Sequence, residues 1–268
     1  MTQSSPVILL INLDRSPERL ARCAAILDRL GLPWERVPGV DGAQLDPAYL
    51  KRLNPQPAPH GEWFRGLSAG ELGCFLSHLK CWQLIADRQL PCAIILEDDF
   101  DLEGSCTAAA LQGLIRSCAQ WDVLKLTRLR NGAKLEASLG EGIELRRGGK
   151  GPEDCCGYMV SLQGALKLTP LRDTLLRPVD FDLKFHWERD LNVLSASPNF
   201  FRQVSHEEAA SVIGDRSEYR RYPWRQKLQV YWRKHRYHIR FWLADKLHIG
   251  RRSVLAAALL RPQQKTSP

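Results

Sequence analysis

The sequence lacks any long uninterrupted apolar stretch. No window of about eighteen residues is both apolar and uncharged, so we expect no membrane-spanning helix. The first six residues contain no lysine or arginine, and Asn12 and Asp14 interrupt the apolar run that begins at Val7. Since a secretory signal peptide has a basic start followed by an unbroken apolar run, we expect none and predict a cytoplasmic protein.

Cysteines at metal-binding spacing are also absent. None of the eight cysteines shows the short C-x-x-C spacing typical of zinc sites, and only Cys155 and Cys156 are adjacent. The remaining cysteines stand singly within apolar patterns. We therefore predict buried free thiols in a reducing compartment.

Positive charge is scarce in the first 215 residues and concentrated beyond them. Residues 1–215 carry 24 basic and 28 acidic side chains, whereas residues 216–268 carry 14 basic and two acidic ones, a net charge of +12. A chain with this asymmetry is expected to meet an anionic surface through its C-terminal part. We predict a main domain over residues 1–215 and a basic, aromatic, helical tail over residues 216–268.

Aromatic and basic residues are interleaved in this tail. Such a mixture suits the headgroup layer of an anionic membrane. Two alternatives remain: a helix packed on the main domain with a solvated basic face, and a nucleic-acid site. We rank the membrane surface first and nucleic acid last. The aromatic members are Tyr222, Trp224, Tyr231, Trp232, Tyr237, Phe241 and Trp242.

The N-terminal residues show a β-α-β pattern. The apolar run 7–13 predicts a strand covered on both faces, Pro17 begins a helical pattern that ends at Gly31, and residues 34–40 predict a second strand. Ligands of open α/β sheets bind beyond the carboxyl ends of strands. The polar residues there are candidate nucleotide contacts, with turn or cap roles as the alternative: Asn12, Asp14, Arg15 and Asp41.

A helix is predicted from Ser68 to about Arg88, and the segments Pro47–Pro59 and Gly132–Gly151 are predicted as loops. Ser68 and Glu71 have the spacing of a capping box, in which each side chain accepts a hydrogen bond from the other's backbone. Glu71, Cys74 and His78 share one helical face, a pattern compatible with metal ligation. Since Glu71 already has a capping role, we favour a structural interpretation.

The segment Ala93–Asp101 places four carboxylates within five positions at the end of an apolar strand. In an extended chain alternate residues share a side, so Glu97, Asp99 and Asp101 can converge while Asp98 points away. Crowded carboxylates repel one another, and a shared divalent cation is the usual compensation. We predict an Mn²⁺ or Mg²⁺ site that could bind a diphosphate; a solvated acidic turn is the alternative.

A second acidic cluster follows about eighty residues later. Metal-assisted group transfer also needs a base for the nucleophile's proton. We predict Asp180 as this base and Asp182 as the second choice. His206 could complete the coordination shell of the metal.

Several segments, in this order, resemble glycosyltransferase family 25, which includes bacterial lipooligosaccharide β-galactosyltransferases and collagen galactosyltransferase domains. They lie between residues 7 and 215: Ile11-Asn-Leu-Asp-Arg-Ser-Pro-Glu-Arg19, Val40-Asp-Gly42, Leu67-Ser-Ala-Gly-Glu-Leu-Gly-Cys74 with Ser77-His78, Leu96-Glu-Asp-Asp99, Gly157-Tyr158 with Gly164-Ala165, and Pro178-Val-Asp180. The ordered set is far more specific than any single segment.

The resemblance implies an α/β fold of the GT-A-like nucleotide-diphospho-sugar transferase type over residues 1–215, a UDP-sugar donor, Mn²⁺ or Mg²⁺ dependence and inversion at the anomeric carbon. By position, Glu97, Asp98 and Asp99 match the family's acidic motif, although Asp99-Phe100-Asp101 also reads D-x-D. Other matching residues are expected on the donor side or in the middle signature: Asp14, Arg15, Arg19, Glu71, Ser77 and His78.

The leading hypothesis is an inverting glycosyltransferase that moves a hexose, with galactose first, from a UDP-sugar to a glycolipid or oligosaccharide acceptor. A lipooligosaccharide or lipopolysaccharide acceptor at the inner face of a bacterial inner membrane is the expected setting. One alternative is a metal-dependent nucleotidyl- or phosphotransferase, but the phosphate-binding loop G-x-x-x-x-G-K-[ST] is missing. Another is a non-catalytic adaptor that binds membranes or nucleic acid.

Overall fold

A computed structural model describes residues 7–55, 65–127, 132–148, 154–170, 174–204, 224, 228, 231–243 and 247. The elements are, in chain order, β1 (Val7–Asn12), α1 (Pro17–Leu30), β2 (Trp34–Pro38), η1 (Gly42–Gln44), α2 (Pro47–Leu53), α3 (Ala69–Asp87), β3 (Cys92–Glu97), β4 (Phe100–Leu102), α4 (Ala108–Arg116), η3 (Cys118–Gln120), β5 (Val123–Lys125), β6 (Lys134–Gly140), β7 (Ile143–Arg147), β8 (Gly157–Ser161), α5 (Leu162–Leu168), α6 (Val179–Asp182), η4 (His186–Arg189), β9 (Val193–Ser197) and β10 (Phe201–Gln203). Residues 231–243 are also helical. None of the described helices has the length and apolar content needed to cross a bilayer.

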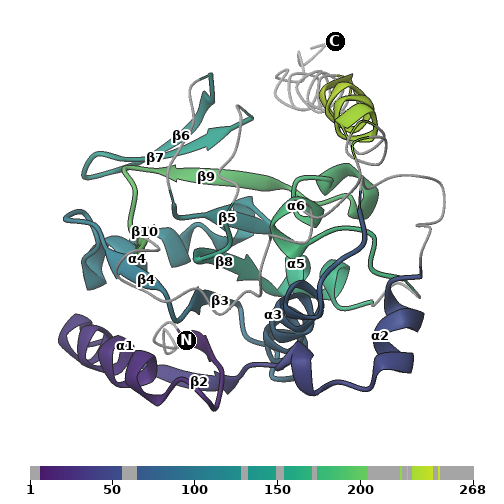
Figure 1. Cartoon of the computed structure of the whole chain (residues 1–268). Coiled ribbons are helices and arrows are strands. Elements are labelled where there is room, and N and C mark those ends of the chain that lie inside the picture. The colour runs from purple at the N-terminus through teal and green to yellow at the C-terminus, as the bar shows by residue number, and fades with distance from the viewer. Residues whose placement is uncertain are drawn as a thin grey trace, which may run out of the picture.

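One mixed sheet of eight strands forms the centre of the molecule, in the order β2-β1-β3-β8-β5-β9-β7-β6 (Figure 1). Six of these strands share one direction, and β8 and β7 run against them. A smaller sheet pairs β4 with β10. The predicted α/β class, with a mixed, mostly parallel sheet flanked by helices, is confirmed. The predicted boundary at residue 215 lies outside the described residues and stays a prediction.

Alternate residues of the central strands point to opposite faces and build two cores. Ile8 and Leu10 of β1 pack with residues of α1 and α4, whereas Leu9 and Ile11 pack with residues of α3 and α5. Both faces of β1 are therefore buried, which explains its near-continuous apolar sequence.

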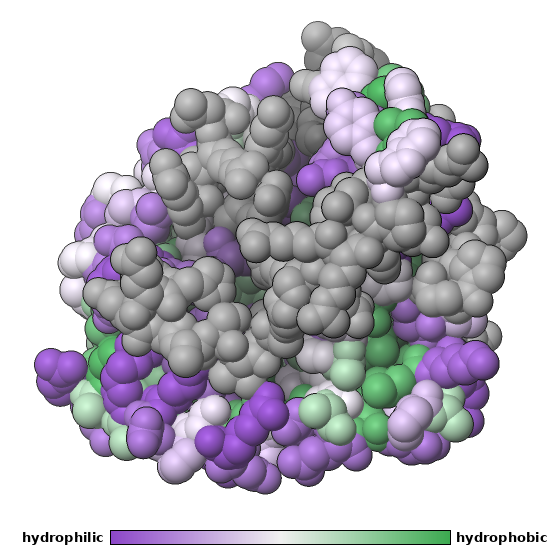
Figure 2. Space-filling view, in the orientation of Figure 1, coloured by the Kyte–Doolittle hydropathy of each residue, from purple (hydrophilic) through white to green (hydrophobic). Residues whose placement is uncertain are grey.

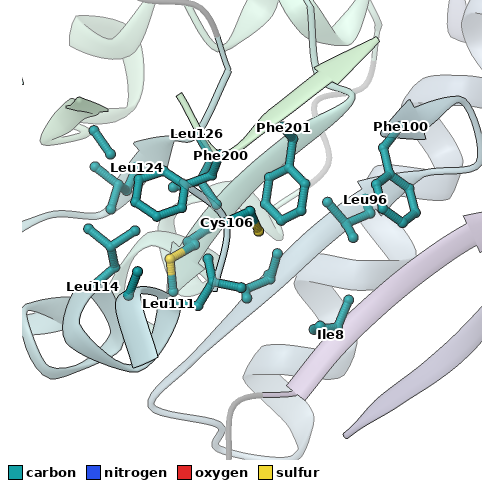
Figure 3. Packing of buried hydrophobic residues seen from close by; sticks show 14 of the residues in the cluster. Ile8, Leu96, Phe100, Cys106, Leu111, Leu114, Leu124, Leu126, Phe200 and Phe201 are labelled. Carbon is teal, nitrogen blue, oxygen red and sulfur yellow. The ribbon is translucent and has the colours of Figure 1, made fainter. Parts of the chain in front are cut away.

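The small sheet is attached to the first core by two phenylalanines. Phe100 of β4 and Phe201 of β10 are fully buried, and their rings meet edge to face with centroids 5.8 Å apart (Figure 3). Burying two large aromatic side chains stabilises this sheet where it follows the acidic end of β3. The acidic turn is thus held by packing on its C-terminal side.

Helix α1 begins at Pro17 and ends before Gly31, as predicted; Gly31 has a left-handed φ of 71°. Ser16 occupies the N-cap position, but its side chain makes no capping bond. The side chain of Asn12 donates instead to the carbonyl oxygen of Ser16, at 3.0 Å. The capping box of α3 is present in full.

Two segments predicted as loops are partly regular structure. Residues Pro47–Leu53 form α2, because Asp46 caps the backbone amides of Ala48 and Tyr49 and Pro47 suits the first helical turn. Residues 134–147 form the β6–β7 hairpin. Its two-residue turn, Glu141 and Gly142, has positive φ at both positions, as a type I′ turn requires.

Two glycines, which have no side chain, allow the backbone after β2 to lie directly against the backbone at the start of α3. A Cβ on Gly42 would lie 1.7 Å from the carbonyl oxygen of Ala69, and one on Gly73 would lie 2.5 Å from that of Val40. Ser77 adds a hydrogen bond, accepting the Val40 amide at 2.8 Å. This contact fixes α3 against the sheet.

Gly42→Ala should therefore lower the free energy of unfolding by about 3 kcal/mol or more, since two backbones must separate to admit the methyl group. Urea denaturation measures the change. Gly104→Ala is the control, because a Cβ there meets nothing within 4 Å, and it should shift stability by less than about 0.5 kcal/mol. Equal effects of the two substitutions would contradict the proposed packing.

Candidate active site

The carboxyl ends of β1, β3 and β5 lie at one edge of the main sheet, because these strands share a direction. Strand β8 runs the opposite way, so its first residues arrive at the same edge. There the backbone amide of Glu97 donates to the carbonyl oxygen of Cys156, at 3.1 Å. Three strands consequently place chemically useful residues at this edge: Glu97, Lys125 and Tyr158.

Asp98 turns away from its acidic neighbours and ties the turn to α1. Its carboxylate accepts hydrogen bonds from Asn12 Nδ2 at 2.8 Å and from Arg19 Nη1 at 2.7 Å. Arg22 donates to the backbone carbonyls of Asp98 and Phe100. Each carboxylate oxygen of Asp98 therefore has a protein partner, and this direction agrees with the alternation expected for an extended chain.

Asp99 has only part of its hydrogen-bonding capacity filled. Its Oδ2 accepts from Gln203 Nε2 at 2.6 Å, whereas Oδ1 is buried and has no partner among the described residues. Burial, together with the charges of Glu97 and Asp98, raises the pKa of Asp99 to about 6. A buried carboxylate beside a second one, with one oxygen unpaired, fits a hard divalent cation with oxygen ligands.

Glu97 is oriented by a buried relay of hydrogen bonds. Trp82 Nε1 donates to the hydroxyl of Tyr158 at 3.1 Å, that hydroxyl lies 2.8 Å from His78 Nδ1, and His78 Nε2 lies 3.0 Å from Glu97 Oε1. An ionised Glu97 can only accept, so His78 Nε2 donates to it. The indole, phenol and imidazole thus fix the direction of the carboxylate.

Cys74 completes a group in which its thiol, His78 and Glu97 place one potential ligand atom each within 4.8 Å. Both imidazole nitrogens are already hydrogen-bonded, so we interpret this group as the end of the relay. The predicted third member, Glu71, is bound elsewhere. Burial would raise the pKa of Glu71, but hydrogen bonds from Arg65 and Ser68 outweigh it and lower that pKa.

Asp180, from α6, shares the electrostatic environment of Glu97. Burial raises the pKa of Asp180 to about 6, and the Glu97 charge adds to the rise. The backbone amide of Phe181, which donates to Asp180 Oδ1 at 2.9 Å, and the Lys125 ammonium act in the opposite direction. An acid eighty-three positions beyond Glu97 is therefore brought to the same site.

Asp182 lies in a different environment, although it is only two residues away. Its Oδ1 accepts two hydrogen bonds from the fully buried guanidinium of Arg177, which also binds Glu188. Arg189 lies 3.9 Å from Asp182 Oδ2. Of the two predicted bases, Asp180 is the one that the geometry favours.

Lys125 is a site residue that the sequence reasoning missed. Its side chain is buried at the end of β5, where Nζ donates to the carbonyl oxygen of Asp154 at 3.2 Å and lies 5.0 Å from the centre of the Tyr158 ring. A lysine inside the apolar run Val123–Leu126 was the available signal. Two more buried atoms at this edge have no partner among the described residues, Thr127 Oγ1 and Asp154 Oδ1.

The other predicted donor residues lie at or near the same edge but already have protein partners. Arg15 pairs with Asp41 at 3.0 Å, and Asp41 also caps η1. Asp14 pairs with Arg36, and Arg19 with Asp98. Their predicted donor contacts, like that of Ser77, stay predictions.

Two further predicted metal ligands are Asp101 and His206. Asp101 pairs with Arg202 across the small sheet. His206 lies outside the described residues, so its predicted role stays a prediction. Of the predicted set, Glu97 is close enough to Asp99 for its charge to raise the pKa of Asp99.

Comparison with known proteins decides the family. A family model described as Glycosyltransferase family 25 (LPS biosynthesis protein) matches residues 5–182. The chain belongs to glycosyltransferase family 25.

Curated proteins similar to this chain include three animal members of family 25. A "Glycosyltransferase 25 family member" of Drosophila melanogaster is 34% identical over 192 residues, covering 69% of this chain and 31% of the relative. The human "Procollagen galactosyltransferase 2" is 28% identical over 211 residues, 71% of this chain and 34% of the relative. A "Probable inactive glycosyltransferase 25 family member 3" of Bos taurus is 30% identical over 211 residues, 71% and 35% of the two chains. The chain thus spans about a third of the length of these relatives.

Several segments that carry the family 25 resemblance owe their sequence to packing. A Cβ on Gly157 would lie 2.9 Å from the Phe201 ring, and one on Gly164 would lie 2.1 Å from the carbonyl oxygen of Asp122. The neighbouring Tyr158 supplies a link of the relay to Glu97. The family motifs therefore combine close backbone contacts with the side chains that those contacts position.

The raised pKa values predict how stability depends on pH. Because the folded state raises the pKa of Asp99 and Asp180 to about 6 from 3.8, the two protonated groups stabilise the fold at low pH, and this contribution is lost as the pH rises through about 6. Asp180→Asn should thus increase the free energy of unfolding at about pH 7.5 by about 1–2 kcal/mol, and by less at about pH 4.5.

Urea denaturation at the two pH values measures this difference in the metal-free protein. Asp101→Asn is the control. Since Asp101 pairs with Arg202, this substitution should not increase the free energy of unfolding. An Asp180→Asn protein that is less stable than wild type at both pH values would contradict the assignment.

Proposed function

We propose that this family 25 chain transfers a hexose from a nucleotide-diphosphate sugar to a hydroxyl group of a glycan acceptor, with inversion at the anomeric carbon. The observation that carries the proposal is that the charge of Glu97 acts on two buried acids, Asp180 and Asp99, and that Asp99 Oδ1 has no partner among the described residues. UDP and galactose are our first choices for the donor. The printed name of the human relative, a galactosyltransferase, supports the choice of sugar.

The donor side of the site is the acidic end of β3. Glu97 and Asp99 would hold Mn²⁺ or Mg²⁺, which would offset the negative charge that builds on the diphosphate as the nucleotide leaves. The hydrogen bond from His78 holds the Glu97 carboxylate in a fixed orientation, and the hydrogen bond from Gln203 does the same for Asp99. Prior orientation of charged groups is what makes such a site effective.

The acceptor side is Asp180. A pKa of about 6 leaves this carboxylate ionised at neutral pH and makes it a stronger proton acceptor than an ordinary aspartate. Asp180 would take the proton of the acceptor hydroxyl as that oxygen attacks the anomeric carbon from the face opposite the departing nucleotide. A single displacement of this kind inverts the configuration.

The acceptor we propose is a lipooligosaccharide, a lipopolysaccharide or a related glycolipid, at the cytoplasmic face of a bacterial inner membrane. The description of the family model as an LPS biosynthesis protein supports this choice. The second candidate is a non-catalytic protein, because some relatives are named inactive. Turnover distinguishes the two.

We expect release of UDP from at least one UDP-hexose in the presence of Mn²⁺ and a glycolipid acceptor, and loss of that release when EDTA is added. The assay uses a panel of UDP-sugars and the full chain. Absence of metal-dependent turnover with every donor and acceptor would count against the catalytic proposal and favour the non-catalytic one.

Asp180→Asn should lower the transfer rate by about 10²- to 10⁴-fold, because the general base is lost. Donor binding, followed by calorimetry with UDP-sugar and Mn²⁺, should be nearly unchanged. Asp87→Asn makes the same chemical change at an exposed position at the end of α3 and should leave the rate intact. Full activity of Asp180→Asn would remove Asp180 from the mechanism.

A further inference from the structure

The helical residues 231–243 pack on the main domain through Tyr237 and Phe241. The rings of Tyr237 and Phe241 lie 5.6 and 5.2 Å from that of Phe185, and Phe241 also lies 5.6 Å from Trp187. Tyr237 is only 7% exposed. Residues four apart share a helical face, so this pair defines the side that faces the domain.

The opposite side carries large apolar and aromatic side chains, with the exposed His235 among them. Trp232, Ile239 and Trp242 are 60%, 59% and 55% exposed, and at about 100° per residue they project away from Tyr237. Tyr231 and Leu243 lie on the same side and are also exposed. The solvent face of an ordinary packed helix is polar, so this side is built for another contact.

Basic residues border this apolar face. Arg236 and Arg240 follow it on one side of the helix, and Lys234 and His238 on the other. Figure 2 shows pale aromatic rings next to hydrophobic side chains on the described part of this helix. An apolar strip with cationic borders matches a helix that lies in the headgroup layer of an anionic bilayer.

We propose that the outward face of residues 231–243 docks on an anionic phospholipid surface. Trp232, Ile239 and Trp242 would enter the boundary between headgroups and acyl chains, while the arginines would bind lipid phosphates. The net charge of +12 on residues 216–268 matches a negatively charged surface. A helix packed on the main domain and a helix that binds a membrane are thus compatible interpretations of the tail. Tyr237 and Phe241 make the first contact, and Trp232, Ile239 and Trp242 would make the second.

The docked helix would also set the orientation of the domain. Phe185, on which Tyr237 packs, follows α6 by three residues, and the Arg177 guanidinium that binds Asp182 lies 3.7 Å from the Phe185 ring centre. The bilayer contact is therefore joined by direct packing to the segment that carries Asp180. The significance of this orientation for catalysis rests on the proposed function, because it depends on the role of Asp180. The docking of the helix on a membrane does not.

Co-sedimentation of the full chain with vesicles tests the docking. Vesicles of phosphatidylcholine alone are compared with equal mixtures of phosphatidylcholine and phosphatidylglycerol. We expect binding to the mixture that weakens as salt is raised, and little binding to phosphatidylcholine. Arg236→Gln with Arg240→Gln should weaken binding about 30-fold, and Trp232→Ser with Trp242→Ser at least about tenfold.

Leu135→Ser is the matched control, since Leu135 is an exposed apolar residue on β6 and should not affect sedimentation. Tyr237 and Phe241 are retained in both double variants, so their thermal unfolding should match wild type. Vesicle binding needs no turnover, so its failure is separate from a failure of the proposed function.

Three outcomes would overturn the proposal. Equal or absent binding to both vesicle types would remove the anionic surface. Tighter binding to duplex DNA than to vesicles, unchanged in the tryptophan variant, would assign the basic residues to nucleic acid. A dimer in solution that the tryptophan variant converts to monomer would assign the face to a second copy of the chain.

Discussion

Repulsion among the consecutive carboxylates at the end of β3 is the constraint on which the site depends. The negative charge of each of these acids is compensated in a different way. Asp98 is neutralised by Arg19 and held by Asn12, and Glu97 accepts from His78. Asp99 accepts an amide hydrogen bond from Gln203, and its buried Oδ1 has no partner in the part of the chain that the structure describes. The protein thus leaves negative charge at the position where a cation would complete the balance.

The surrounding fold serves this arrangement. The backbone contact between Gly42 and Ala69 fixes α3, which carries His78 and Trp82, and the reversed direction of β8 brings Tyr158 to the same edge. Without the reversal, residue 158 would lie at the far end of the strand. The order and direction of the central strands thus bring the residues that orient Glu97 to one edge of the sheet.

Local sequence patterns predicted many elements of the fold and the acidic strand end. They could not predict contacts between residues far apart in the sequence. The β-α-β unit, the capping box at Ser68 and the acidic strand end depend on near neighbours, so spacing alone revealed them. Lys125 and the partners of His78 depend on which strands become adjacent and in which register, which spacing does not encode. The α2 helix and the β6–β7 hairpin were missed because proline and glycine, usually signs of loops, here begin a helix and form a turn. In the tail, composition could not show which aromatics pack on Phe185 and which face outward.

The most direct test of the central claim is the binding of Mn²⁺ to the chain, followed by the loss of the free-ion signal in electron paramagnetic resonance. The account predicts one Mn²⁺ site per chain at about pH 7.5, weakened as the pH falls below about 6 and absent in Asp99→Asn. An Asp99→Asn protein that binds Mn²⁺ as tightly as wild type would contradict it.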